Sequence, residues 1–146
     1  MNIDNLNWKI LKCLQENARQ SNAEIGRQVG ITSPAVSERI KKMEDLGIIE
    51  GYKTIVSPFE IGYQLRAIIT LRAFMGKLKP FLEKVKTYDE VINCYRITGD
   101  ENIVMEVVLK NQKHLESFID QLIIYGESKT QIALSHVVKQ KAVKSL

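Results

Sequence analysis

The chain has 146 residues, of which 45% are hydrophobic and 26% are charged, and its formal net charge is +4. This length allows one large or two small domains, and the composition is that of an ordinary soluble protein. No apolar run approaches the roughly 20 residues that a membrane span needs, and the first residues lack the layout of a signal peptide. We therefore expect a cytoplasmic protein with no membrane partner, in which Cys13 and Cys94 are small hydrophobic residues rather than metal ligands.

The first predicted element is a helix from Asp4 to Gln15. Asp4 is placed to cap it, and apolar residues recur at helical spacing along one side: Leu6, Ile10, Leu11 and Leu14. Trp8 lies off this stripe, so we expect a partly buried surface aromatic there.

Residues 21–46 then predict a helix-turn-helix. Ser21 and Glu24 have the spacing of a capping box, and Gly30 is suited to end the first helix. Ser33 followed by Pro34 indicates the start of a second helix that runs to Leu46, with the Ser33 oxygen as its cap. Two helices joined by so short a turn occur in DNA-binding proteins and also in many proteins that never touch DNA. The predicted core of these three helices is Leu6, Ile10, Leu14, Ile25, Val29, Ile31, Val36, Ile40, Met43 and Leu46.

Charge is segregated within this half of the chain. Residues 1–60 hold eight basic and eight acidic residues, and residues 61–146 hold thirteen and nine. Between residues 19 and 42, however, five basic side chains stand against only Glu24 and Glu38. Such a local patch attracts phosphates even where the domain as a whole is neutral.

Residues 48–56 are rich in β-branched side chains and predict a strand, either the wing of a winged helix or a hinge. We place a winged helix-turn-helix domain at residues 1–55, a linker at 56–65 and a second domain at 66–146.

The second domain alternates strands and helices in the order βαββαβ, which is the ferredoxin-like arrangement. The predicted elements are a strand at Arg66–Phe74, a helix at Leu78–Thr87, strands at Val91–Thr98 and Asn102–Lys110, a helix at Lys113–Tyr125 and a strand at Lys129–Lys139. The fold class is therefore α+β. Both helices would cover one face of the sheet, and a second copy of the domain is the simplest cover for the other face.

Taken together, the chain resembles the Lrp/AsnC family of feast/famine transcription regulators over almost its full length. The resemblance rests on D-N-L-N-W-K-I-L-K-C-L-Q-E-N-A-R, on I-T-S-P-A-V-S-E-R-I-K-K-M-E-D-L-G-I-I, and on the L-G-I-I-x-G-Y that ends the motif. It implies a DNA-binding regulator, not an enzyme, with no cofactor, that assembles as dimers and as an octamer made of four dimers.

The resemblance implies that the helix from Ser33 enters the major groove of double-stranded DNA. The implied DNA-binding residues are Ser21, Asn22, Ser33, Pro34, Ala35, Ser37, Glu38, Arg39, Lys41 and Lys42. Glu38 has a favoured alternative role as an intrahelical partner of Lys41 or Lys42. Arg39 either contacts DNA or is tied to an acidic residue such as Glu44.

The resemblance also implies a sensing site for an amino acid around the loop between the two middle strands of the second domain. The implied residues are Ile97, Thr98, Gly99, Asp100, Glu101, Asn102, Thr130 and Ile132. Here the chain departs from the family pattern T-G-x-x-D-Y, since Asn102 and Ile103 replace its last two residues, and Ile132 replaces the second threonine of T-x-T. The effector is then a different molecule, or there is none.

Three functions follow from these features. The first is a sequence-specific transcriptional regulator modulated by an amino acid or related small molecule. The second is an architectural protein that wraps DNA without an effector. The third, catalysis, is disfavoured because the two histidines, His114 and His136, lie near no paired nucleophile and show no metal-ligand spacing.

Overall fold

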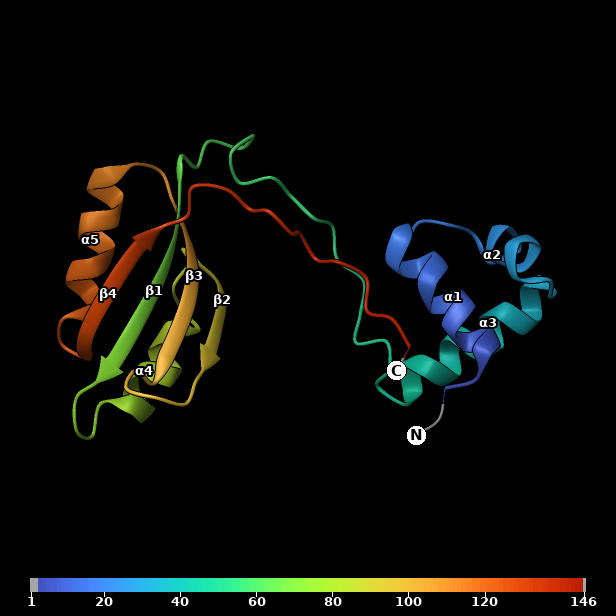
Figure 1. The fold of residues 1–146 in the computed structure, drawn as a ribbon, viewed down its shortest axis with the longest axis horizontal. Helices are drawn as coiled ribbons and strands as arrows, with labels where there is room; N and C mark the ends of the chain where they lie inside the picture. Colours follow the sequence, from blue (N-terminus) through green and yellow to red (C-terminus); the bar gives the residue numbers. More distant parts are fainter. Residues whose placement is uncertain (1–2, 146) are drawn as a thin grey trace. The chain divides into compact units, whose positions relative to one another are not determined.

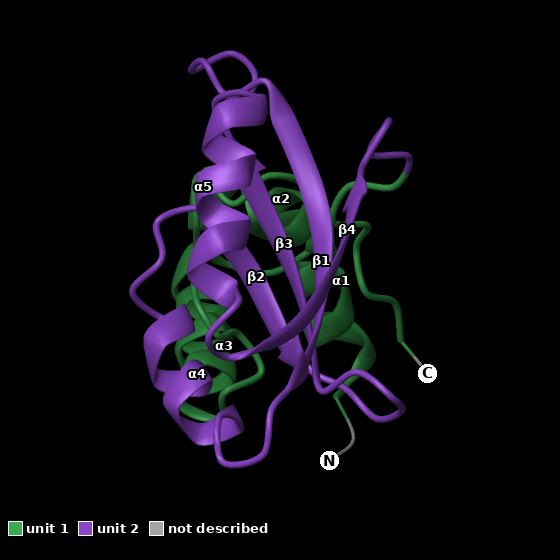
Figure 2. Cartoon of the chain, turned by 90° about the vertical axis from the view of Figure 1, so that its left-hand side faces the viewer, with its two compact units in different colours: residues 1–55, 138–146 green, residues 56–137 purple. Residues whose placement is uncertain are grey.

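The computed structural model describes residues 3–145, which divide into two compact units (Figure 2). The N-terminal unit contains residues up to 55 together with the C-terminal segment from Val138, and the C-terminal unit contains Val56–Val137. The resemblance led us to expect an N-terminal helix-turn-helix followed by an antiparallel sheet with helices, and this fold class is confirmed.

The N-terminal unit consists of α1 (Asn5–Glu16), α2 (Asn22–Val29) and α3 (Ser33–Asp45) (Figure 1). As predicted, Asp4 caps α1 by accepting a 2.6 Å hydrogen bond from the Asn7 N–H. The predicted capping box also forms, because the Ser21 side chain accepts from the Glu24 N–H and the Glu24 carboxylate accepts from the Ser21 N–H. Both helix starts are thus fixed by residues adjacent to them in the sequence.

The start of α3 differs from the prediction in one respect. Ser33 does not cap the helix but is its first residue, because Thr32 occupies the extended cap position. The Thr32 side chain makes no capping hydrogen bond to the first turn of α3. The end of α3 is closed by Gly47 in the left-handed conformation, with the Ile48 N–H donating to the Met43 carbonyl at 2.8 Å.

Three helices bury one small apolar core, centred on Ile10, Ile25, Val36 and Met43. Trp8 packs against this core while remaining half-buried, as expected. The core prediction is wrong at Leu46, which is 47% exposed because α3 ends one residue before it and the backbone turns away at Gly47.

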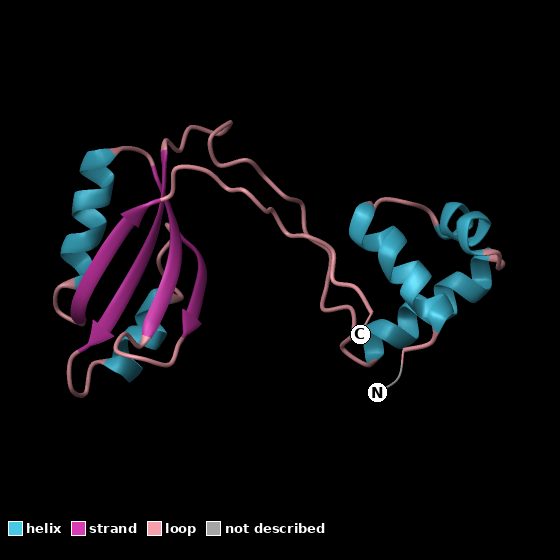
Figure 3. Ribbon diagram, viewed as in Figure 1, coloured by secondary structure: helices cyan, strands magenta, loops and turns pink. Residues whose placement is uncertain are grey.

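The strand predicted at residues 48–56 is absent from the structure, and Figure 3 draws this segment as a loop. A strand needs a neighbouring strand to pair its backbone groups, and none lies beside this segment in its own unit. Ile48 and Ile49 still pack partly against the helical core, whereas Ile55 further along is 76% exposed.

The C-terminal unit is one four-stranded antiparallel sheet with two helices on one face (Figure 2). Its elements are β1 (Leu65–Ala73), α4 (Leu78–Val85), β2 (Val91–Arg96), β3 (Ile103–Leu109), α5 (Gln112–Leu122) and β4 (Gly126–Ile132), with strand order β2-β3-β1-β4. The predicted βαββαβ order and the β2–β3 hairpin are therefore confirmed.

The two faces of the sheet differ in character. Alternate residues of β1, such as Ile69 and Leu71, are fully buried against Phe81 of α4 and Phe118 of α5. On the other face, Ile68 of β1 and Val104 of β3 are only half-buried and Tyr95 of β2 is 61% exposed. This face therefore leaves apolar side chains exposed to solvent.

The last strand was predicted at Lys129–Lys139 but runs from Gly126 to Ile132. It begins earlier because Gly126 pairs with Ala73, so close to the Arg72 carbonyl that a side chain would not fit. It ends at Ile132, opposite Ala67, and after one more bond, from the Ala133 N–H to the Arg66 carbonyl at 2.9 Å, the chain leaves the sheet. The predicted strand residue His136 therefore lies beyond the sheet.

The C-terminal segment from Val138 is attached to α1 through one side-chain amide. Gln15 donates to the Val143 carbonyl at 3.0 Å and accepts from the Val143 N–H at 2.8 Å. The Gln15 amide thus bonds both the N–H and the C=O of one residue, as a facing residue does in an antiparallel sheet.

We expect Gly26→Ala to lower the free energy of unfolding of the N-terminal unit by about 1–3 kcal/mol, the usual cost of overpacking. A Cβ atom at Gly26 would lie 2.5 Å from the Ile31 carbonyl oxygen, and backbone cannot move aside cheaply. Urea denaturation followed by the fluorescence of Trp8, the single tryptophan, measures this unit directly.

The matched control is Gly30→Asn. Gly30 also lies in the turn, but nothing is within 4 Å of its Cβ position, and asparagine tolerates its left-handed backbone at φ 80°. Equal denaturation midpoints for the two variants would contradict the steric role of Gly26.

Candidate functional site

The outward face of α3 carries small polar and basic side chains. Pro34, Ser37, Glu38 and Lys41 are exposed along it, while Val36 and Met43 on the opposite face are buried. Among the other predicted DNA-binding residues, Ser21 and Lys42 are exposed, and Asn22, Ser33, Ala35 and Arg39 are half-buried. A face with these groups suits both the edges of bases and the phosphates of DNA.

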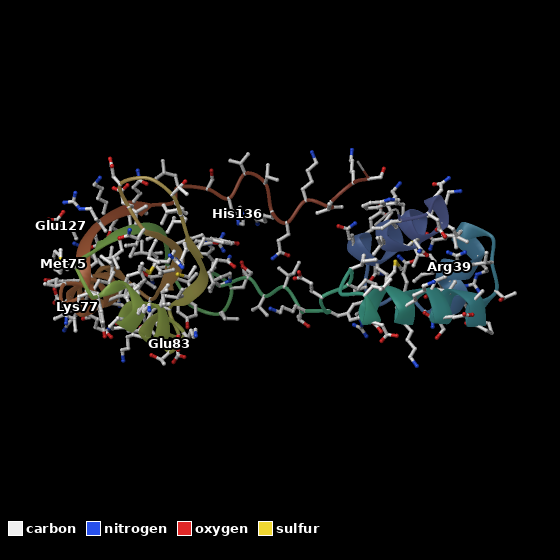
Figure 4. The ribbon with its side chains drawn as sticks, turned by 90° about the horizontal axis from the view of Figure 1, so that it is seen from below. Arg39, Met75, Lys77, Glu83, Glu127 and His136 are labelled. Atoms are coloured by element: carbon white, nitrogen blue, oxygen red, sulfur yellow. The ribbon has the colours of Figure 1, made fainter. Side chains whose placement is uncertain are left out.

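Arg39 is tied to the start of α1 rather than to Glu44. Its Nη1 atom donates to Asp4 Oδ2 at 2.7 Å and to Asn7 Oδ1 at 2.9 Å. The hydrogen bond from Arg39, together with the one from the Asn7 N–H, holds the pKa of the Asp4 carboxyl below its usual value. These residues line a groove of about 400 Å³ beside α3, together with Ala35, Glu38 and Lys42. Figure 4 marks Arg39 where α1 and α3 meet.

Glu44 has a different partner, the Tyr52 of the L-G-I-I-x-G-Y motif. The Tyr52 hydroxyl donates to Glu44 Oε1 at 2.9 Å, which ties the segment after α3 back to the end of that helix. Partial desolvation, and then the Glu44 carboxylate, raise the pKa of Tyr52 to about 12.

The loop between β2 and β3 is anchored to the end of β1 by Asn102. Its N–H donates to the Leu71 carbonyl at 2.9 Å, and its side-chain oxygen accepts from the Ala73 N–H at 2.8 Å. Gly99, at φ 111°, supplies the turn that glycine makes without strain. Asn102 therefore holds the loop, and the exposed polar groups belong to Thr98, Gly99 and Asp100.

A charged cleft of about 160 Å³ lies between this loop and the adjoining strands, lined by Arg72, Asp100, Glu101, Glu127 and Lys129. Lys129 donates to Glu101 at 2.6 Å, and Arg72 pairs with Glu127 across β1 and β4. The hydrogen bond from Lys129 lowers the pKa of Glu101, and the Glu101 carboxylate raises the pKa of Lys129. Figure 4 marks Glu127 at this end of the unit.

Not all of the predicted effector residues gather there. Thr130 lies opposite Ile69 and Ile132 opposite Ala67, so both stand on the helix-covered face, away from the cleft. Sequence reasoning found Asp100 and Glu101 but missed Arg72, Glu127 and Lys129. Alternation along β4 places Glu127 and Lys129 on one face, yet only the register of β4 against β1 brings them to Arg72.

The two histidines have ordinary partners. His114 Nε2 lies 2.9 Å from Glu90 Oε1, and His136 Nδ1 contacts the Arg66 guanidinium. Within residues 3–145, His, Cys, Asp and Glu side chains form no group of three that could hold a metal ion. None of the helices in that range is both long and apolar enough to cross a membrane.

Comparison with protein families gives two matches. Residues 3–50 match the family described as winged helix-turn-helix DNA-binding, and residues 66–143 match the Lrp/AsnC ligand binding domain. The chain is 32% identical over 141 residues to the HTH-type transcriptional regulator LrpB of Bacillus subtilis, covering 95% of this chain and 93% of LrpB.

Solved structures resemble the whole chain. AsnC of E. coli has a TM-score of 0.85 and 29% identity, with 95% of this chain and 97% of AsnC covered. A transcriptional regulator of Neisseria meningitidis, solved as a complex with L-Met, has a TM-score of 0.92, with 97% and 96% covered. At 24% identity the latter establishes likeness of fold only.

We expect Lys129→Gln to raise the pKa of Glu101 toward the ordinary value for glutamate, because the lost hydrogen bond and charge are the main causes of its depression. A depressed folded-state pKa contributes stability that is present above the unfolded pKa and lost as pH falls through the folded one. The variant should therefore lose stability less steeply between about pH 5 and pH 3. Carbon-detected NMR titration of the Glu101 carboxyl measures the shift.

Lys86→Gln, which breaks the exposed pair with Glu83, is the control. An unchanged Glu101 titration in Lys129→Gln would refute this account of the cleft.

Proposed function

Because the chain belongs to the Lrp/AsnC family of transcriptional regulators, we propose that α3 reads a specific DNA sequence and that a small molecule bound in the C-terminal unit modulates this binding. The family makes the chain a DNA-binding transcriptional regulator with a ligand-binding domain, and not an enzyme. Sequence specificity, the nature of the effector and the assembly are the proposed parts.

The observation that carries the DNA proposal is the outward face of α3. Ser37 and Lys41 are exposed on it, and the first turn of the helix receives no side-chain cap from Thr32. Side chains of Asp4, Ser21 and Asn111 cap α1, α2 and α5, whereas α4, like α3, has no side-chain cap. Free N–H groups at the start of a helix favour a phosphate, while Ser33, Pro34, Ala35 and Ser37 would lie against base edges.

A single recognition helix reads few bases, so we propose that the regulator acts as a dimer. Two helices related by a two-fold axis would read half-sites about 34 Å apart. The open face of the sheet supports this assembly, because Ile68, Val104 and Tyr95 leave apolar surface there that a second copy could cover. Four such dimers would form the octamer that the family resemblance implies.

For the effector we propose an amino acid or a related zwitterion at the loop of residues 97–102. Asp100 could receive its ammonium group, and the backbone around Gly99 could receive its carboxylate. The cleft beside this loop holds both signs of charge, on Arg72 and Lys129 and on three carboxylates. The L-Met complex of the Neisseria meningitidis protein of the same fold supports this class of ligand.

One observation favours the alternative of an architectural DNA-wrapping protein without an effector. Asn102 replaces the aspartate of the family pattern and is already bonded to the backbone of Leu71 and Ala73. Thr130 and Ile132 stand on the other face of the sheet from the cleft. The usual ligand set is therefore incomplete here.

The DNA proposal is tested by Lys41→Gln and Ser37→Ala. We expect Lys41→Gln to weaken binding to every duplex alike and to reduce the slope of log affinity against log salt by about 1, as for one lost phosphate contact. Ser37→Ala should instead reduce discrimination between the selected site and random duplex by about 1 kcal/mol, as for one lost hydrogen bond. Fluorescence anisotropy at four salt concentrations separates the two effects. A wild-type protein with no preference for any selected site over random duplex would refute sequence-specific binding.

The effector proposal is tested by thermal unfolding of the full chain with each of the twenty amino acids. A true ligand at a hundred times its dissociation constant should add about 2.7 kcal/mol of stability. Arg72→Gln, which removes a cation from the cleft, should lower this gain, whereas Lys86→Gln at an exposed pair on α4 should not. If no amino acid stabilises the wild-type protein, amino-acid sensing is refuted and the architectural alternative is favoured.

A further inference from the structure

Arg39 lies on a different side of α3 from the residues proposed to enter the major groove. Successive residues of an α-helix are about 100° apart, so Arg39 is about 160° from both Ser37 and Lys41 around the helix axis. Consistent with this, Ser37 and Lys41 are exposed, whereas the Arg39 side chain is 34% exposed and is turned toward α1. When Ser37 and Lys41 face a groove, Arg39 faces away from it.

The partners of Arg39 are themselves fixed. Asp4 uses one carboxylate oxygen to cap α1, accepting from the Asn7 N–H at 2.6 Å, and the other to accept from Arg39 at 2.7 Å. The Asn7 side-chain oxygen accepts a second bond from the same Arg39 nitrogen at 2.9 Å. The guanidinium is thus bound to the first turn of a helix that lies more than 30 positions earlier in the sequence.

The hydrogen bonds of Arg39 restrain the rotation of α3 about its own axis, which the apolar core alone does only weakly. Only Val36 and Met43 of α3 are fully buried, and both lie on one narrow side of the helix. Ile40 packs partly against the core beside them, but apolar packing is not directional, so these contacts restrain rotation of α3 about its own axis weakly. A charged hydrogen bond placed to one side of these contacts restrains the rotation directly. Contacts to base edges require positioning within about 10–20°.

We infer that Arg39 is a positioning residue, which sets the rotation of α3 through Asp4 and Asn7 and does not itself read bases. The inference rests on the proposed function, because it assigns Arg39 a part in sequence discrimination by α3. It also gives Asp4, an acidic residue outside the helix-turn-helix, a part in recognising a polyanion. That role is the opposite of what its charge alone would predict.

The variant Asp4→Asn tests the inference in the full-length protein. Asparagine caps helices as well as aspartate, so α1 keeps its start while the ion pair to Arg39 is lost. We expect the ratio of affinities for the selected site and random duplex to fall about fivefold, which corresponds to the upper end of what exposed ion pairs contribute. Affinity for random duplex and the salt slope should stay as in the wild type.

Arg39→Gln and the double variant Asp4→Asn/Arg39→Gln complete a double-mutant cycle. If Arg39 acts only through Asp4 and Asn7, Arg39→Gln should lower discrimination by a similar factor without changing the salt slope, and the double variant should be no worse than either single one. Glu16→Gln removes the same charge from the other end of α1, where Glu16 lies 3.9 Å from Lys12, and should leave discrimination unchanged. Trp8 fluorescence confirms that each variant is folded.

The opposite results would overturn the inference. If Arg39 binds DNA and Asp4 merely competes for it, Asp4→Asn should tighten binding to every duplex, and Arg39→Gln should reduce the salt slope by about 1. If the wild type discriminates but Asp4→Asn discriminates equally well, only the positioning role fails. If the wild type itself shows no preference, the proposed function fails and this inference fails with it.

Discussion

Gly26 and the peptide of Ile31 pack so closely that only glycine fits at this point of α2. The Ile31 carbonyl oxygen lies 2.5 Å from where a Cβ of Gly26 would stand, and the Gly26 carbonyl accepts from the N–H groups of both Gly30 and Ile31. Gly26 is therefore held on two sides of its backbone. Its Cα faces the Ile31 carbonyl, and its own carbonyl accepts from the N–H groups of the turn. This close approach restrains the turn between α2 and α3, while the bonds of Arg39 act on the rotation of α3 about its own axis.

The different sides of α3 make different contacts. Val36 and Met43 hold the helix on the apolar core, Arg39 ties its flank to Asp4 and Asn7, and Ser37 and Lys41 remain exposed. Val36 and Met43 are seven positions apart and Ser37 and Lys41 are four apart, so each pair lies on one side of this helix of 13 residues. Arg39 lies on a further side. A basic residue on α3 therefore cannot be assigned to DNA from its charge alone, because its angular position decides which neighbour it meets.

The sequence was most informative where a structure is set by neighbouring residues. The caps at Asp4 and Ser21, the end of α2 at Gly30 and the hairpin at Gly99 all depend on contacts within a few positions, and all were predicted. The cap of α3, at Thr32 instead of Ser33, is a local failure, but the larger failures came where distant residues decide. The segment 48–56 has strand-forming residues but no partner strand, and the Asp4–Arg39 pair and the charged cleft both join residues that are far apart in the chain. Strand register likewise decides that Thr130 faces the helices and Lys129 the cleft.

Asn102 anchors the loop between β2 and β3 although it is not the acidic residue of the family pattern. Its side-chain oxygen accepts from the Ala73 N–H at 2.8 Å, a bond that an amide oxygen makes as readily as a carboxylate does. The cleft already holds Asp100, Glu101 and Glu127 against two cations, Arg72 and Lys129. A fourth carboxylate would add repulsion at the same end of the sheet, because like charges at close range disfavour ionisation. Asparagine makes the same bond to Ala73 without that repulsion, so its presence at position 102 changes the charge of the loop between β2 and β3 and keeps this backbone contact.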